Sequence, residues 1–204
     1  MSEQPEASRP GHQAPSGALL LLLGFAVAVG AGGVPDAVEA QQVQPGMTSV
    51  YTQLVASHFG VPSGEARLLV EDLERAEDLP VVLLLARESG LSPSVILSRR
   101  QRGAPTQHTP WLEVARQVQL GGGVFYVEIA ADQVDDRVRR PMGLFEGTPR
   151  AQWAGLDLTD DEVVDLTHVK VLSRHLMVEK GRVLEARERA GSWVASIPQL
   201  MGVP

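Results

Sequence analysis

The stretch that decides the fold is LLARESGLSPS, residues 84–94. It predicts a helix that ends at Gly90, because glycine readily adopts the left-handed backbone just past a helix end. Ser92 stands where a helix N-cap is expected, and Pro93 suits the first position of a second helix. The pattern is that of a helical hairpin with a tight turn.

Two further stretches repeat this pattern. They are LVASHFGVPSGE, residues 54–65, and VLSRHLMVEKG, residues 171–181. Gly60 takes the turn position in the first, whereas Met177 takes it in the second. Because a residue with a Cβ rarely adopts the left-handed backbone, we expect the turn at Met177 to differ or to be strained.

The similarity continues beyond the turns. Residues 95–102 align with 182–189, and Trp111 aligns with Trp193 at the head of a short third helix. Self-similarity of this kind indicates stacked helical units, and so few units predict one compact all-α domain of repeated helix-turn-helix hairpins. The expected helices cover residues 48–58, 63–75, 79–89, 93–102, 110–119, 160–176, 180–190 and 192–200.

Residues 121–158 depart from this pattern. The run VFYVEI, residues 124–129, is β-branched and aromatic and predicts a short strand. It would pair within 131–158, pair with another chain, or pack unpaired as an extended segment. Residues 137–149 are expected to be a loop. A long loop in a compact domain is usually functional or mobile.

The first 40 residues are expected to be a targeting segment, followed by a domain over 41–204 that opens on a linker, 41–46. An apolar run, Ala18–Val34, precedes candidate cleavage sites after Ala31 and Ala40. This arrangement is typical of a secretory signal peptide, and the alternative is an uncleaved anchor helix at the lower limit of spanning length. Since Arg9 precedes the run and acidic residues follow it, the domain is expected to be periplasmic or secreted.

Composition excludes several kinds of chemistry. The chain of 204 residues has no cysteine, so it forms no disulfide, thiolate metal site or cysteine nucleophile. Its net charge of −7 argues against non-specific nucleic-acid binding, which needs a cationic surface. We find no complete catalytic motif.

The residues most suggestive of a metal site lie in the expected 160–176 helix. Glu162, Asp165 and His168 are spaced i, i+3, i+6, and Asp161 is four residues before Asp165. Residues six apart rarely ligate one ion without another segment. The simpler interpretation is an acidic first turn that complements the helix dipole, with an exposed histidine, and we predict no metal, cofactor or catalytic residue here.

The other histidines also lack partners in the sequence. His175 lies about 10.5 Å along the helix from His168, too far for a shared metal. His58, beside Phe59 at a helix end, is expected to be partly buried or to face the helix dipole. His108 lies in a polar loop and could act as a base, but no partner is evident.

The three tryptophans suggest different roles. Trp111 and Trp193, at equivalent positions, are expected to be core residues packed between the two longer helices of their own units, with ligand stacking as the alternative. Trp153 has no counterpart in the other units and is the better candidate for contact with a partner.

Residues 85–96 resemble a DNA-binding helix-turn-helix, through the spacing of Ala86, Gly90 and Ile96. The resemblance implies a close helix crossing, with the helix from Ser92 entering the major groove. Export, acidic charge and the apolar side chains of that helix oppose DNA contact. The arginines that follow are expected to form a solvated helix end: Arg99, Arg100 and Arg102.

A wider region, residues 54–129 and 160–200, is similar to an uncharacterised family of small exported bacterial helical-repeat proteins. The similarity is carried by DLPVVLLLAR (78–87), GLSP (90–93), the helix headed by Trp111, and FYV (125–127). That family has no assigned activity, so the resemblance implies architecture and export only.

These observations predict an exported envelope protein with a non-catalytic binding or structural role, whose partner is an unknown protein or envelope component. We expect no nucleic-acid partner. We expect contact with a membrane only if the N-terminal segment stays uncleaved. The alternatives are a metal-dependent or other enzyme with an unrecognised site, and a DNA-binding protein. An enzyme should bring histidine and carboxylates into one pocket. A binding module should show an exposed apolar patch near 124–156.

Overall fold

The computed structural model describes residues 45–102 and 108–202. The chain divides into two units, residues 1–40 and 41–204, and all described residues belong to the second. The predicted signal peptide or anchor and its cleavage sites therefore lie outside the described residues.

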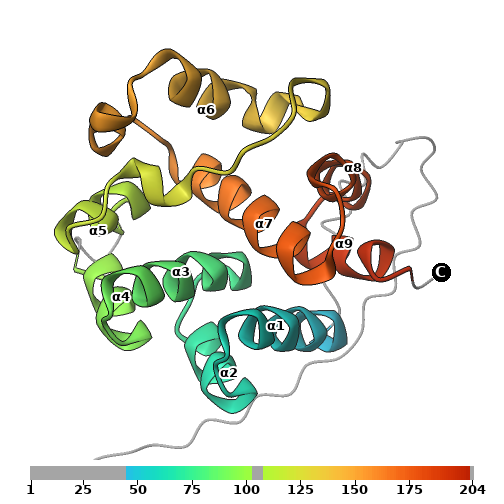
Figure 1. Ribbon diagram of the computed structural model, residues 1–204. Helices are drawn as coiled ribbons and strands as arrows, with labels where there is room; N and C mark the ends of the chain where they lie inside the picture. Colours follow the sequence, from blue (N-terminus) through green and yellow to red (C-terminus); the bar gives the residue numbers. More distant parts are fainter. Residues whose placement is uncertain (1–44, 103–107, 203–204) are drawn as a thin grey trace, which may run out of the picture. The chain divides into compact units, whose positions relative to one another are not determined.

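Within the described ranges the fold is all-α, as predicted, with short 3₁₀ turns (η) and no β-strand (Figure 1). The elements are α1 (Pro45–Phe59), α2 (Ser63–Glu71), η1 (Ala76–Asp78), α3 (Leu79–Ser89), α4 (Pro93–Arg100), α5 (Trp111–Gln117), η2 (Gly122–Phe125), η3 (Ala131–Gln133), α6 (Asp136–Gly147), η4 (Arg150–Gly155), α7 (Asp160–Leu176), α8 (Lys180–Ala190) and α9 (Trp193–Leu200).

The predicted hairpin turns have the expected backbone. Gly60 and Gly90 are left-handed, with φ of 69° and 70°. Met177 is also left-handed, with φ of 56°, and its side chain is 88% exposed, so this turn is strained as the sequence predicts. The first helix starts at Pro45 rather than at 48, so the expected linker, 41–46, ends earlier than predicted.

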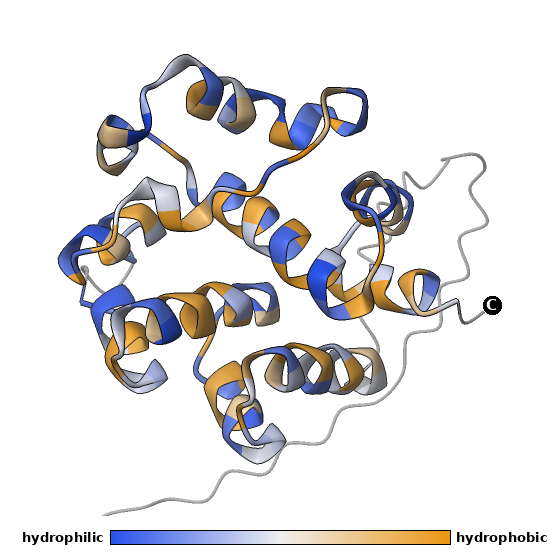
Figure 2. Ribbon diagram, viewed as in Figure 1, coloured by the Kyte–Doolittle hydropathy of each residue, from blue (hydrophilic) through white to orange (hydrophobic). Residues whose placement is uncertain are grey.

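Helix α3 forms the centre of the core. Every residue from Leu79 to Ala86 is buried, and α3 packs against α1, α4 and α7. Figure 2 shows this helix as hydrophobic along most of its length. Burial of Ala86 and Ile96 agrees with the predicted close packing of α3 on α4.

No single helix among the described residues is long and apolar enough to span a membrane. Residues 76–89 and 93–100 reach that length and hydropathy only together. They are bent by 118° at the Gly90 turn, and the apolar residues of α3 lie inside the core.

The strand predicted at 124–129 is wrong, because no partner strand is present in the described part of the chain. Gly122–Phe125 forms a 3₁₀ turn, and the residues after it are extended but unpaired. Phe125, Val127 and Ile129 are buried while the residues between them are more exposed. The alternation therefore reflects packing of an extended segment, the third of the possibilities that the sequence left open.

The loop predicted at 137–149 is also wrong, because α6 occupies most of it. Asp135 caps this helix by accepting hydrogen bonds from the backbone N–H groups of Arg137 and Val138. The buried residues of α6 share one face: Val138, Pro141, Met142 and Phe145.

Two glycines allow η2 to approach η4 closely. A Cβ at Gly121 would lie 2.5 Å from Ala154 Cα, and one at Gly122 would lie 2.8 Å from the Trp153 carbonyl oxygen. The glycine run 121–123 is therefore a packing feature of this segment.

Candidate functional site

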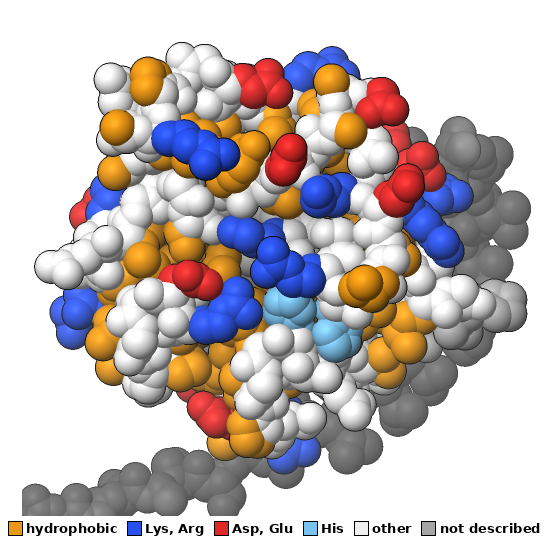
Figure 3. Space-filling view, in the orientation of Figure 1, with side chains coloured by type: hydrophobic (Ala, Val, Ile, Leu, Met, Phe, Trp, Pro, Cys, Tyr) orange, Lys and Arg blue, Asp and Glu red, His pale blue; other side chains and the backbone are white. Residues whose placement is uncertain are grey.

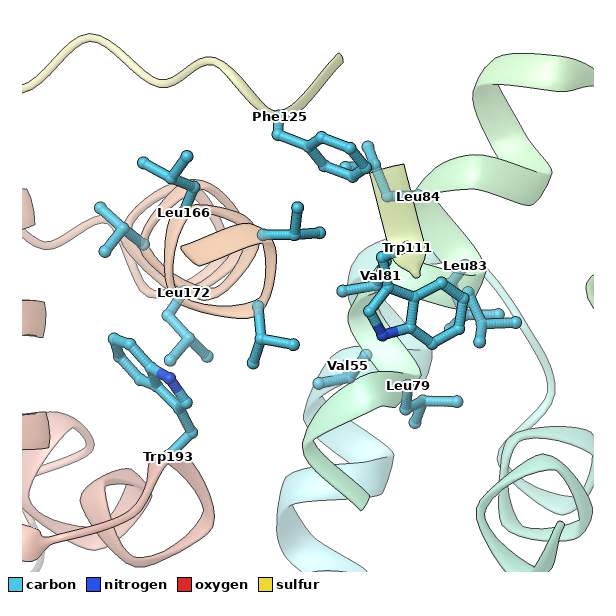
Figure 4. Packing of buried hydrophobic residues seen from close by; sticks show 14 of the residues in the cluster. Val55, Leu79, Val81, Leu83, Leu84, Trp111, Phe125, Leu166, Leu172 and Trp193 are labelled. Carbon is cyan, nitrogen blue, oxygen red and sulfur yellow. The ribbon is translucent and has the colours of Figure 1, made fainter. Parts of the chain in front are cut away.

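Trp111 heads α5 and is fully buried against α3 and α4. Figure 4 shows its indole beside Leu79, Val81 and Leu83. The indole N–H donates to Asp78 Oδ1 at 3.2 Å, and the Arg100 guanidinium lies 4.5 Å from the ring centroid. The predicted core role of Trp111, between the two longer helices of its unit, agrees with these contacts.

Trp193 heads α9 and has a matching environment. It is fully buried, its indole N–H donates to Asp165 Oδ1 at 2.8 Å, and Arg187 lies 5.7 Å from its ring centroid. Asp165 belongs to α7 and Arg187 to α8, the two longer helices of its unit. The sequence alignment places Arg187 opposite Arg100, so the arginine contact is also matched.

The backbone N–H groups of the two tryptophans donate to carboxylates in a reciprocal manner. Trp111 N–H donates to Asp160 Oδ1 at 2.7 Å, at the start of α7. Trp193 N–H donates to Glu77 Oε1 at 2.5 Å, just before α3. Each hairpin thus supplies the acid that caps the short helix of the other. These contacts are consistent with a repeat of α3–α5 in α7–α9, which stays a prediction.

His168 is buried, not exposed as the simpler sequence interpretation had it. Its ring stacks on Trp193 at 4.7 Å between centroids, and Tyr51 lies on another side. Nδ1 lies 2.8 Å from the Val164 carbonyl oxygen, which can only accept, so Nδ1 carries the proton. Nε2 then accepts from the Tyr51 hydroxyl at 2.8 Å. Burial lowers the pKa of His168 from 6.5 to about 3, which keeps the ring neutral.

The acidic residues of α7 diverge instead of forming a metal site. Asp161 pairs with Arg75 at 2.8 Å. Glu162 completes a capping box with Thr159 and binds Arg140 at 2.6 Å. Each carboxylate has its own partner.

Asp165 is half-buried, and it accepts its hydrogen bond from the buried indole of Trp193 rather than from an arginine. Burial raises its pKa, and the hydrogen bond from the Trp193 indole opposes that rise. Among the described residues, no group of three histidine or carboxylate side chains could hold a metal ion.

The remaining histidines make contacts that the sequence did not reveal. His58 and His175 meet edge to face, 5.7 Å between ring centroids, and burial lowers the pKa of His58 to about 4. His108 is half-buried with Nε2 2.7 Å from Glu74 Oε1, so it has a carboxylate partner after all.

On the face in Figure 3, Lys and Arg side chains gather near the middle beside histidine.

Helices α3 and α4 meet at a bend of 118°, and the arginines that follow the turn are not all solvated as expected. Arg100 is buried, binds Asp160 Oδ2 at 2.6 Å and donates to the Thr109 carbonyl oxygen. Arg99 is half-buried, and only Arg102 is exposed. Arg100 is therefore a structural residue that joins α4, α5 and α7.

Trp153 is turned toward its own chain. It is half-buried, lies 4.6 Å from Tyr126 and 5.0 Å from Phe145 between ring centroids, and its indole N–H donates to the Thr148 carbonyl oxygen at 2.8 Å. The aromatic cluster joins α6 and η4 to the extended segment. Trp153 is thus largely used within the domain and is a weaker candidate for partner contact than the sequence suggested.

The apolar patch expected near 124–156 is absent from that segment. The large apolar side chains that are exposed among the described residues lie elsewhere: Val50, Leu68, Leu91, Val95, Met177 and Met201. Two of them, Val50 and Met201, line an apolar groove between α1 and α9 with a volume of about 290 Å³.

A larger cavity of about 520 Å³ lies beside the turn between α7 and α8. Three cations line it: Lys170, Arg174 and Lys180. The rest of the lining comes from the extended segment, η3, α7 and the turn: Tyr126, Val127, Glu128, Gln133, Ser173, Val178 and Glu179. The cavity could not be predicted from the sequence, because one of its walls belongs to the segment after Gly123, where a strand and a loop were expected.

Comparison with protein-family models, with curated proteins and with solved structures finds no match to this chain. The resemblances to a helix-turn-helix and to a family of small exported proteins stay predictions.

Proposed function

We propose that the protein is an exported, non-catalytic binding domain of the cell envelope. Export is supported by the sequence, through the apolar run Ala18–Val34 and the small residues that follow it. Binding is supported by the cavity beside α7 and α8, whose volume lies in the range of small-molecule sites.

One observation carries the non-catalytic part of the proposal. The side chains of α7 best suited to acid–base or metal chemistry are committed to internal bonds, since His168 accepts from Tyr51 and Asp165 accepts from Trp193. A general base needs a lone pair directed at substrate, and the one free ring nitrogen of His168 already accepts from the buried Tyr51 hydroxyl. The cavity beside α7 and α8 then offers recognition through three cations.

Cell fractionation with intact-mass analysis of the native protein tests the proposal. We expect the protein in the periplasm or medium, with a mature N-terminus after Ala31 or Ala40. An intact Met1 terminus in the membrane fraction would support the anchor alternative, and a cytoplasmic protein would contradict export.

A further inference from the structure

We propose that the cavity beside α7 and α8 binds a small oxyanion, either the carboxylate or the phosphate group of a solute. This inference rests on the proposed binding function and names its ligand class. It is carried by three cations that line one cavity without carboxylate partners. Among the described residues, none of Lys170, Arg174 and Lys180 forms an ion pair within 4.0 Å.

Lys170 is the most informative of the three. Its ammonium group is half-buried and donates to the Val124 carbonyl oxygen at 2.7 Å, which uses one of three N–H groups. Burial lowers the pKa of Lys170, because desolvation disfavours the charged form. Glu88 favours the charged form of Lys170 from a distance, but no carboxylate of the described residues lies within 4.0 Å of the ammonium, and a bound oxyanion would supply a close negative charge and the missing acceptors.

Arg174 and Ser173 extend the same wall. Arg174 follows Lys170 by four residues, one turn further along α7, so both side chains lie on one face of the helix. A guanidinium presents two parallel N–H groups that match a carboxylate or phosphate. The Ser173 hydroxyl is a further donor in the lining.

The start of α8 lines the opposite side. Lys180 is the first residue of this eleven-residue helix, and the preceding Glu179 makes no side-chain cap bond. The positive end of the helix dipole and the Lys180 ammonium therefore act in the same direction.

Two carboxylates in the lining restrict the ligand. Glu128 and Glu179 are exposed at the cavity, so the lining has three cations and two anions. A long polyanion would meet these carboxylates along with the cations. A small solute can place its oxyanion against Lys170 and Arg174 alone. The cavity then selects such a solute through direct hydrogen bonds to these two side chains rather than through the net charge of its lining.

Isothermal titration of the full chain tests this inference. Inorganic phosphate and malonate are titrated separately, with sodium chloride holding the ionic strength constant. We expect saturable binding of at least one of them, and the one that binds identifies the oxyanion. Lys170→Gln and Arg174→Gln should each weaken binding by about tenfold.

Arg189→Gln is the matched control. It removes the same charge from an exposed position on α8 outside the cavity lining, and binding should be unchanged. If Lys170→Gln alters the thermal melt, Arg174→Gln decides alone, because Arg174 is exposed. No saturable binding of either anion to the wild type, or equal weakening by Arg189→Gln, would overturn the inference. Neither result depends on where the cell places the protein, so failure of export is a separate outcome.

Discussion

Replacement of Trp193 tests how far the buried tryptophans hold this domain together. Trp193 is fully buried, stacks on His168 and donates to Asp165. Trp193→Ala removes the whole indole and should lower the free energy of unfolding by about 3–5 kcal/mol, a large share of the stability of a domain of this size. Urea unfolding followed by helical circular dichroism measures the loss.

Trp193→Phe separates the hydrogen bond from the packing. It keeps an aromatic ring but leaves Asp165 without its indole donor, which should cost about 1–3 kcal/mol. Trp111→Phe is the matched control, because Asp78 keeps the Arg75 guanidinium at 3.1 Å when the indole N–H is lost. We therefore expect Trp111→Phe to cost less than Trp193→Phe.

Unchanged urea midpoints in Trp193→Ala and Trp111→Ala would refute the core role of the two indoles and favour ligand stacking. Equal costs for the two phenylalanine variants would refute the distinction between Asp165 and Asp78.

Three further predictions concern packing and pH. Ala86→Leu should overpack the contact of α3 with α4 and cost about 1–3 kcal/mol in a thermal melt, and an unchanged melting temperature would contradict the close crossing. Gly121→Ala should destabilise by about 1–3 kcal/mol, since its Cβ would meet the η4 backbone, whereas Gly143→Ala in α6 meets nothing within 4 Å and should stabilise by about 0.5–1 kcal/mol. Because the pKa of His168 is about 3 when folded and near 6.5 when unfolded, the unfolded chain binds the proton first as the pH falls. The free energy of unfolding should then decrease as the pH falls from 6.5 to 3, by up to about 1.4 kcal/mol per pH unit. Urea unfolding at a series of pH values measures this decrease, which should be smaller in His168→Gln.

Helix positions were largely predictable because they depend on local signals. The left-handed Gly60 and Gly90, and the capping box of Thr159 with Glu162, fix helix ends from nearby residues. Helix α6 was missed because Pro141 and Gly143 suggest a loop. The signal for it was present, since Val138, Met142 and Phe145 have helical spacing.

The contacts of the site were less predictable because they join distant residues. Repeat alignment predicted that Trp111 and Trp193 are buried, but their acidic partners come from remote helix starts. Glu77 lies 116 residues from Trp193 in the sequence, and Asp160 lies 49 from Trp111. No local pattern encodes such pairs.

The cavity shows the same limit. Lys170 and Arg174 have a spacing that places them on one helix face, yet the opposing Tyr126 and Gln133 come from the segment whose structure was predicted wrongly. Without that segment the two cations look like an ordinary solvated face.

Our central proposal is that the imidazole and carboxylate groups of α7 stabilise the fold and take no part in catalysis. Nitrogen-15 NMR of the histidine side chains across a pH titration measures this directly. We expect His168 to stay neutral, with its proton on Nδ1, as the pH falls well below 6.5 in the folded protein. A His168 that titrates near 6.5, or that carries its proton on Nε2, would contradict the account.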